Sequence, residues 1–211
     1  IRIEPSQALQ PVTRTILAHM PQSMIDANKT WYYAFPNWDP GDHPWERYPF
    51  YHAHGKNKMS MTVDLKREEG RQILKNLVAV SDVLIENNVP ETMEKLGVDY
   101  EELRSIKPDI IVASISGYGH SGPQKDYMGY GPAIAPLTGI SSLTGHAGGP
   151  PEELGISYGD PNGGINAAVV ICAALTARKR TGRGQYIDVS LWDAMAALVP
   201  EGWMQYVMNG T

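Results

Sequence analysis

Asp160 and the glycines around it form the part of the sequence best suited to covalent chemistry. The run Asp160-Pro-Asn-Gly163-Gly164 follows directly on Gly159. Asp and Pro are typical of the first positions of a helix, so the pattern predicts a helix start with the carboxylate among free backbone amides. Such amides hold a carboxylate in its ionised form, and glycine lets a ligand approach the backbone closely. An ionised carboxylate placed in this way can attack the carbonyl carbon of a thioester, and the same amides can stabilise the oxyanion that forms.

A simpler interpretation of Asp160 requires no chemistry. A carboxylate at the N-cap accepts a hydrogen bond from the first helical turn and stabilises the helix by about 1 kcal/mol. The local pattern by itself favours this interpretation. A chemical role for Asp160 therefore needs support from the rest of the sequence.

A glycine-rich motif resembles the phosphate-binding loop of dinucleotide-binding proteins. Gly117-Tyr-Gly-His-Ser-Gly122 matches GxGxxG and follows a predicted strand. The next residues, from Pro123 onward, do not predict the helix whose N-terminus must receive the pyrophosphate. No carboxylate occurs between Ala135 and Ser142, where the ribose ligand is expected. These failures argue against a nicotinamide site.

Other reactive side chains give little support to alternative chemistries. His52 and His54 have no third ligand at a suitable spacing, so we expect no metal. Cys172 lies in an apolar run, and we expect it to be buried and unreactive. The sequence contains no GxSxG, which argues against a serine hydrolase.

The composition restricts the class of protein. The chain has 42% hydrophobic and 19% charged residues, as globular domains do, and its formal net charge of -5 argues against nucleic-acid binding. A single cysteine excludes an internal disulfide and indicates a reducing compartment. No signal peptide is visible, and no apolar run approaches the roughly 18 residues of a membrane span. We therefore expect a cytoplasmic protein that binds neither nucleic acid nor membranes.

Strand and helix patterns alternate along most of the chain. This alternation predicts parallel β-α-β units, hence an α/β fold with a Rossmann-like parallel sheet covered by helices on both faces. After a short strand at 1–4, strands are predicted at 59–65, 82–85, 109–115 and 185–189, and helices at 68–79, 91–96, 100–106, 161–181 and from about 192.

An aromatic segment precedes these elements. The stretch from Trp31 to Tyr51 contains nine of the eighteen aromatic residues, in a region rich in Pro, Asp and Gly. So many aromatic side chains must pack on another surface. They could line a pocket for a bulky acyl group or form a subunit interface, and the interface is the favoured interpretation.

Several motifs, in the same order and spacing, resemble the family III CoA-transferases of the CaiB/BaiF type. No single motif is decisive, but the ordered series is specific, and it favours the chemical interpretation of Asp160. The series consists of Asn57-Lys58, Val63-Asp-Leu-Lys66, Ser81-Asp-Val-Leu-Ile-Glu-Asn87, Leu96-Gly97, Lys107-Pro-Asp-Ile-Ile111, Ser116-Gly-Tyr-Gly-His-Ser-Gly-Pro123, Gly159-Asp160 and Arg180-Thr-Gly-Arg-Gly-Gln185.

The resemblance implies a mechanism and a set of ligands. Asp160 matches the nucleophile of the family, which attacks an acyl-CoA to give a mixed anhydride and then an aspartyl-CoA thioester. Coenzyme A and acyl-CoA are substrates in this family, and no permanently bound cofactor is implied. Matching positions place one group of residues at the adenosine end of CoA, with a lysine near phosphate: Val63, Asp64, Leu65, Lys66 and Asn87, and Lys95.

The resemblance also implies an assembly and a domain arrangement. It assigns residues 1–190 to the CoA-binding domain and 191–211 to a helix leading toward a small second domain outside this chain. Family members form interlocked homodimers. Because the family's first strand and its second domain have no counterpart here, we expect this polypeptide to be part of a longer protein and inactive alone.

One motif departs from the family pattern. Many relatives read Glu-Asn-Phe-Arg-Pro-Gly where this chain reads Glu86-Asn-Asn-Val-Pro-Glu91. The missing arginine and glycine weaken the expectation of a standard phosphate contact at this point.

Two other functions remain open. An acyl-CoA racemase of the same superfamily needs a histidine opposite the aspartate. The matching stretch, Tyr127 to Ala133, has none, and His120 and His146 fall outside it. A non-catalytic subunit of a heteromeric transferase is the second alternative, and the presence of Asp160 argues against it.

Overall fold

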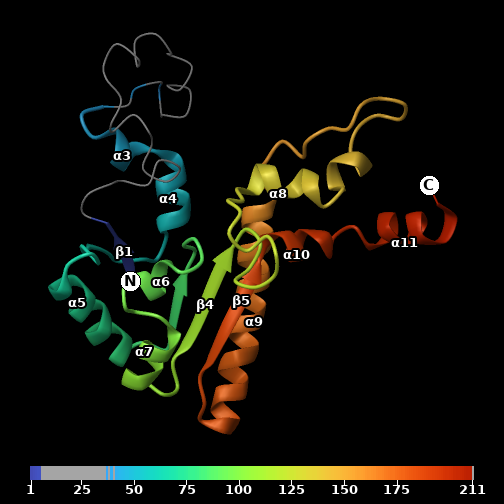
Figure 1. Cartoon of the computed structure of the whole chain (residues 1–211). Helices are drawn as coiled ribbons and strands as arrows, with labels where there is room; N and C mark the ends of the chain where they lie inside the picture. Colours follow the sequence, from blue (N-terminus) through green and yellow to red (C-terminus); the bar gives the residue numbers. More distant parts are fainter. Residues whose placement is uncertain (6–36, 38, 40, 211) are drawn as a thin grey trace. The chain divides into compact units, whose positions relative to one another are not determined.

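The computed structural model describes residues 1–5, 37, 39 and 41–210, which fall into two compact units, Ile1–Ile73 and Leu74–Thr211 (Figure 1). In the first unit, β1 (Arg2–Glu4) pairs in parallel with β2 (Ser60–Thr62). Two short helices lie between these strands in the chain, α3 (Pro44–Arg47) and α4 (Pro49–Gly55). Much of the predicted aromatic segment, residues 31–36, 38 and 40, lies outside the described residues.

A three-stranded parallel sheet organises the second unit. Its order is β3-β4-β5, with β4 (Ile111–Ser116) between β3 (Val83–Glu86) and β5 (Gln185–Ser190). Helix α5 (Glu68–Ala79) crosses the boundary between the units. The remaining helices are α6 (Thr92–Lys95), α7 (Tyr100–Ile106), α8 (Gly131–Leu137), the 3-10 helix η4 (Ile140–Leu143), α9 (Gly159–Thr181), α10 (Leu191–Ala196) and α11 (Pro200–Asn209).

One face of this sheet packs against α9. Because side chains alternate between the faces of a strand, Ala113 and Val189 point to the same side, and they pack on Ala167 and Ile171 of the helix. Helix α9 ends where Gly182 adopts a left-handed conformation, with a φ of 69°. The N–H of Gly182 donates a hydrogen bond to the carbonyl oxygen of Arg178. The prediction of an α/β fold with parallel sheets flanked by helices and a long helix is confirmed.

The opposite side of α9 is exposed, although it is apolar. Ile165 and Val169 are 65% and 63% exposed, and Cys172 is exposed as well. The expectation that Cys172 is buried is therefore wrong. The apolar run around Cys172 extends over the whole circumference of α9, and only one side of the helix meets the sheet.

The last segment contains two helices where the sequence pattern predicted one. Helix α10 ends at Ala196, and α11 begins at Pro200. Proline has no backbone N–H to continue a helix and is favoured at a helix start, so Pro200 separates the two. None of the described helices is both long and apolar enough to cross a membrane.

The beginning of α9 packs tightly on the segment after β5. A Cβ atom at Gly163 would lie 2.1 Å from Cδ2 of Leu191, whereas a Cβ atom at Gly164 would meet nothing within 4 Å among the described residues. The space beside Gly163, which we expected to be left for a ligand, is thus occupied by Leu191. Close packing at Gly163 fixes the first turn of α9 against α10.

Two neighbouring substitutions test this packing. Gly163→Ala should lower the free energy of unfolding by about 1–3 kcal/mol because the new methyl group collides with Leu191. Gly164→Ala, its matched control, should raise it by about 0.5–1 kcal/mol because alanine favours a helix and open space surrounds the site. Urea unfolding of both variants provides the measurement. Equal shifts in the same direction would contradict the packing described for Gly163.

Candidate functional site

Asp160 is the second residue of α9 and not the cap in front of it. The helix begins at Gly159, and its N-cap is Tyr158, whose side chain makes no capping hydrogen bond. The backbone N–H of Asp160 donates to the carbonyl oxygen of Ser157 at 3.1 Å. The predicted helix start is two residues late, and the interpretation of Asp160 as an N-cap is wrong.

The Asp160 carboxylate meets the beginning of a different helix. The backbone N–H of Gly131, the first residue of α8, donates a hydrogen bond to it. A Cβ atom at position 131 would lie 2.5 Å from Oδ2 of Asp160, so any larger residue would collide with the carboxylate. Gly131 was not among the predicted site residues, although Gly131-Pro132 is typical of a helix start.

Pairs of glycines bring the segments around Asp160 together. A Cβ atom at Gly159 would lie 3.1 Å from Cα of Gly131, and one at Gly117 would lie 2.9 Å from Cα of Gly129. Gly117 directly follows the central strand β4. The two contacts therefore connect the carboxyl end of this strand, through the loop before α8, to the first turn of α9.

The surroundings of Asp160 change the acidity of its carboxyl group. Burial raises the pKa of Asp160 above its ordinary value, and the hydrogen bond from Gly131 opposes this rise. The effect of burial is the larger one, even though the residue as a whole is exposed. The sequence pattern predicted a carboxylate held ionised by helix amides, but removal from water outweighs the amide at this position.

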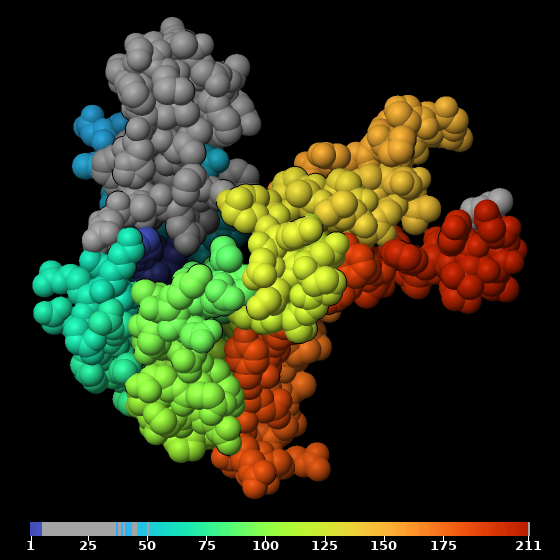
Figure 2. Space-filling view, viewed as in Figure 1, coloured from blue at the N-terminus to red at the C-terminus, as the bar shows by residue number. Residues whose placement is uncertain are grey.

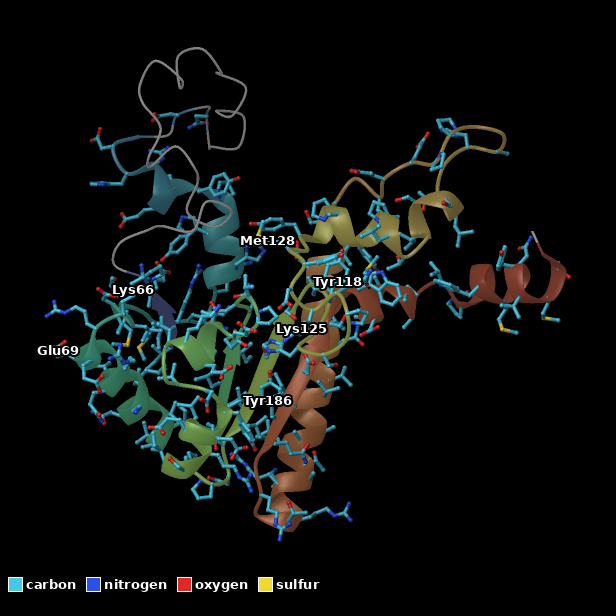
Figure 3. All side chains as sticks on the ribbon, in the orientation of Figure 1. Lys66, Glu69, Tyr118, Lys125, Met128 and Tyr186 are labelled. Atoms are coloured by element: carbon cyan, nitrogen blue, oxygen red, sulfur yellow. The ribbon has the colours of Figure 1, made fainter. Side chains whose placement is uncertain are left out.

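A second group of polar side chains lies on the face of the sheet opposite α9. The hydroxyl of Ser114, which is buried, donates to Glu86 at the end of β3 and lies 2.6 Å from Nε2 of His120. Tyr186 of β5, labelled in Figure 3, also hydrogen bonds to Ser114. The tautomer of His120 decides whether its ring nitrogen donates to the Ser114 oxygen or accepts from it. This network was not predicted, because it depends on strand register.

The loop after β4 is fastened onto the same face. The backbone N–H of His120 donates to Asp188 at 2.9 Å, and Gly119 lies against Asp188 and Ser190. In the space-filling view the yellow-green residues after β4 lie next to the orange-red residues around β5 and α10 (Figure 2). The GxGxxG motif thus forms a loop held by the sheet. It does not begin a helix, in agreement with the prediction from the sequence.

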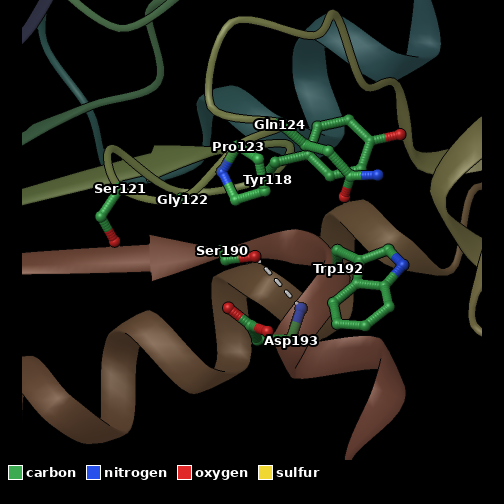
Figure 4. Close-up of a pocket in the computed structure, with 8 residues that line it drawn as sticks. All are labelled: Tyr118, Ser121, Gly122, Pro123, Gln124, Ser190, Trp192 and Asp193. Carbon is green, nitrogen blue, oxygen red and sulfur yellow. Dashed lines mark hydrogen bonds between the residues drawn. The ribbon is translucent and has the colours of Figure 1, made fainter.

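A hollow lies between this loop and the β5–α10 junction (Figure 4). It encloses about 430 Å³, part of it open to solvent. Ser190 caps α10 at its floor by accepting a hydrogen bond from the N–H of Asp193 at 3.1 Å. Its lining comprises Tyr118, Ser121, Gly122, Pro123, Gln124, Ser190, Trp192 and Asp193.

The residues predicted to contact CoA fall into two groups. Asn87 and Lys95 follow β3 in the second unit, where Lys95 forms an ion pair with Glu91 at 3.2 Å. In the first unit Val63 is buried, and Oδ1 of Asp64 accepts a hydrogen bond from the N–H of Lys66 at 3.0 Å. Leu65 lies between these two residues in the same turn.

Comparison with known proteins places these features in a family. Residues 34–211 match the family model described as CoA-transferase family III. A succinate–glutarate CoA-transferase of Agrobacterium fabrum is 38% identical over 161 residues, which are 76% of this chain and 40% of that protein. A succinyl-CoA–D-citramalate CoA-transferase of Chloroflexus aurantiacus is 36% identical over 155 residues, covering 74% of this chain and 39% of that protein. The chain thus spans about two fifths of the length of these relatives.

A solved structure agrees with the sequence comparisons. A CAIB/BAIF family protein from Brucella suis superposes with a TM-score of 0.75 at 38% identity, over 78% of this chain and 44% of that one. The resemblance found in the ordered motifs is therefore confirmed. The chain belongs to CoA-transferase family III.

Proposed function

We propose that the protein containing this chain transfers CoA from an acyl-CoA thioester to a carboxylic acid, with Asp160 as the nucleophile. The observation that carries the proposal is the Asp160 carboxylate, which accepts a hydrogen bond from the Gly131 N–H and lies at the carboxyl end of the central strand. Ligands of open α/β sheets bind at this end of the strands. Because the chain spans only part of its relatives' length, the experiments below use the longer protein.

The proposed reaction proceeds through two kinds of covalent intermediate. A carboxylate oxygen of Asp160 attacks the thioester carbonyl carbon, the C–S bond breaks, and CoA leaves as the thiolate while a mixed anhydride remains. The thiolate then attacks the Asp160 carbonyl carbon, which releases the donor acid and leaves an aspartyl-CoA thioester. The acceptor acid repeats both steps in the reverse order. Each step exchanges one acyl bond for another, so no oxidant or net proton transfer is required.

The acidity of Asp160 fits a nucleophile. A carboxyl group with a raised pKa gives a more basic carboxylate, which donates its electron pair more readily. The Gly131 N–H is placed to hydrogen bond to an oxygen of this group as charge develops on it. Gly164 keeps the predicted role of allowing a ligand to approach closely, whereas Gly131 already lies against Gly159 and Leu191 already fills the space beside Gly163.

We also retain the predicted contacts of CoA as part of the proposal. Val63, Asp64, Leu65, Lys66 and Asn87 would surround the adenosine end, and Lys95 would meet phosphate. The Val63 side chain is buried, and the Asp64 carboxylate is engaged by the N–H of Lys66 in the turn. This segment would therefore contact CoA mainly through its backbone.

The names of the relatives suggest the class of acid. Succinate, glutarate, citramalate and oxalate appear in the names of the similar transferases. All four are short dicarboxylic acids, so we propose a dicarboxylic acid as donor or acceptor. This proposal competes with the aromatic pocket considered for residues 31–51.

The alternatives have less support. The stretch from Tyr127 to Ala133 contains no histidine, and its Gly131 N–H hydrogen bonds to the Asp160 carboxylate. His120, which lies outside this stretch, hydrogen bonds to Ser114. A racemase base opposite Asp160 is thus not identified among the described residues. One similar protein is named as the beta subunit of a succinyl-CoA–L-malate CoA-transferase, so a heteromeric assembly is an alternative to the homodimer.

The proposed assembly is an interlocked homodimer. The exposed apolar side of α9, with Ile165 and Val169, supports a covered surface at this position. In the proposed arrangement residues 1–190 belong to the CoA-binding domain, and 191–211 lead to the second domain.

Replacing the nucleophile tests the proposal directly. Asp160→Asn should reduce CoA transfer between acids by on the order of a thousandfold or more, since no acyl group can be carried on the side chain. With acyl-CoA and hydroxylamine, mass spectrometry should find the modification at Asp160 in the wild type and none in the variant. Transfer at the normal rate by the variant would exclude Asp160 as nucleophile. Solvent deuterium entering the α-carbon without CoA exchange would instead indicate racemisation.

The raised pKa of Asp160 predicts a pH-dependent effect on stability. Between the ordinary pKa near 4 and the higher pKa of the folded state, the folded protein keeps a proton that the unfolded chain loses. Ionisation at higher pH therefore opposes folding. Asp160→Asn should be more stable than the wild type at pH 8, and the difference should shrink as the pH falls toward 4. Urea unfolding measures this difference, with Asp193→Asn as the control for losing a first-turn charge. A difference that stays constant with pH would contradict the account of Asp160.

A profile of accepted acids tests the substrate class. Succinate and glutarate should give higher kcat/KM values as acceptors than benzoate or phenylacetate. A preference for the aromatic acids would instead favour the pocket at 31–51.

A further inference from the structure

Glu91 occupies a backbone conformation that is unfavourable for its residue type. Among the described residues three that are not glycine have a positive φ: Asn37, Asn57 and Glu91. Asparagine tolerates this left-handed region because its short side chain bonds locally, whereas glutamate gains no such contact. Glu91 has a φ of 68° and makes no side-chain cap to the helix it precedes. A strained residue that persists suggests that its side chain has a task.

The Glu91 side chain holds two lysines from different segments. Oε2 of Glu91 lies 3.2 Å from Nζ of Lys95, one turn along α6. Oε1 lies 3.8 Å from Nζ of Lys125, which is labelled in Figure 3 and belongs to the loop after β4. The hydrogen bond from Lys95 is the largest cause of a lowered pKa at Glu91, and the charges of Lys95 and Lys125 add to it. The carboxylate is thus the shared counter-ion of both ammonium groups.

The ion pairs lie where an α/β sheet binds ligands. Strands β3 and β4 are parallel neighbours, with Glu86 opposite Ser114. The segments that carry Glu91 and Lys125 both leave the carboxyl ends of these strands. This edge of an open parallel sheet is the usual position of a phosphate-bearing ligand. All three side chains are partly exposed, so an anion from solution can reach both ammonium groups.

We propose that Glu91 is an internal competitor for the anion that Lys95 and Lys125 bind, and that a phosphate group of the ligand displaces its carboxylate. The identity of this ligand as CoA rests on the proposed function. Displacement breaks two ion pairs and forms new ones with phosphate, so Glu91 lowers the affinity for CoA and eases release of the product acyl-CoA at the end of the cycle. In the competing explanation Glu91 only ties the two loops together.

Binding measurements with a matched pair of variants separate these explanations. Glu91→Gln removes the counter-ion, and Glu94→Gln makes the same change of net charge on the same helix. Glu94 has no ion pair among those described. Isothermal titration should compare wild type and variants with coenzyme A and with inorganic pyrophosphate, at low and at high ionic strength. Glu91→Gln should lower the Kd for both probes by about two- to fivefold relative to Glu94→Gln. Added salt should reduce the gain, since the charges are exposed.

Each outcome bears on one of the two proposals. Equal Kd values for Glu91→Gln and Glu94→Gln, with CoA still bound, would overturn the role of Glu91 and leave the transferase proposal intact. Tighter pyrophosphate binding by Glu91→Gln without CoA binding by any variant would support the role of Glu91 and oppose the transferase proposal. Glu91→Gly provides a second variant without backbone strain, because glycine adopts a positive φ freely. Weaker binding by both Glu91 variants would show that Glu91 organises the site and would also overturn the proposal.

Discussion

The close approach of Gly131 to Asp160 is the constraint on which the candidate site depends. A carboxylate can lie against a helix start only if no side chain intervenes, and a Cβ atom at position 131 would come within 2.5 Å of it. The same absence of side chains lets Gly159 rest on Gly131 and Gly117 rest on Gly129. The segments around positions 117, 129–131 and 159–160 thereby converge at the carboxyl end of β4. Their backbones, and not a set of polar side chains, define the place where Asp160 is held.

This arrangement has an energetic cost that serves the proposed chemistry. Loss of contact with water disfavours the charged form of Asp160, although the residue is exposed, and the hydrogen bond from the Gly131 N–H does not restore the balance. A carboxylate well solvated at a helix start would be more stable and also less basic. A residue that lowers the stability of the fold while increasing its own reactivity is typical of active sites, because selection on function tolerates such losses.

The sequence predicted the elements better than the contacts between them. The pattern of 68–79 matches α5, and the strands and the long helix α9 lie within a few residues of their expected places, because local apolar periodicity determines them. The sequence singled out Asp160 as a candidate but placed it wrongly in the helix, since Asp-Pro resembles a cap and gives no sign that Ser157 and Tyr158 begin the turn. Gly131 and the Ser114 network depend on register and loop packing between distant segments. Cys172 was placed inside because an apolar helix gives no indication of which side will be covered.

Labelled oxygen provides the most direct test of the central claim, that the Asp160 carboxylate becomes covalently acylated during transfer. The acceptor acid would carry ¹⁸O in both carboxylate oxygens, and the peptide containing Asp160 would be examined by mass spectrometry after turnover with acyl-CoA. Attack of the acceptor on the aspartyl-CoA thioester leaves one acceptor oxygen on the aspartate when CoA departs with the acyl group. The account predicts one ¹⁸O atom in Asp160 after a single cycle. Full conversion of the acceptor to its CoA ester, with no label in Asp160, would contradict it.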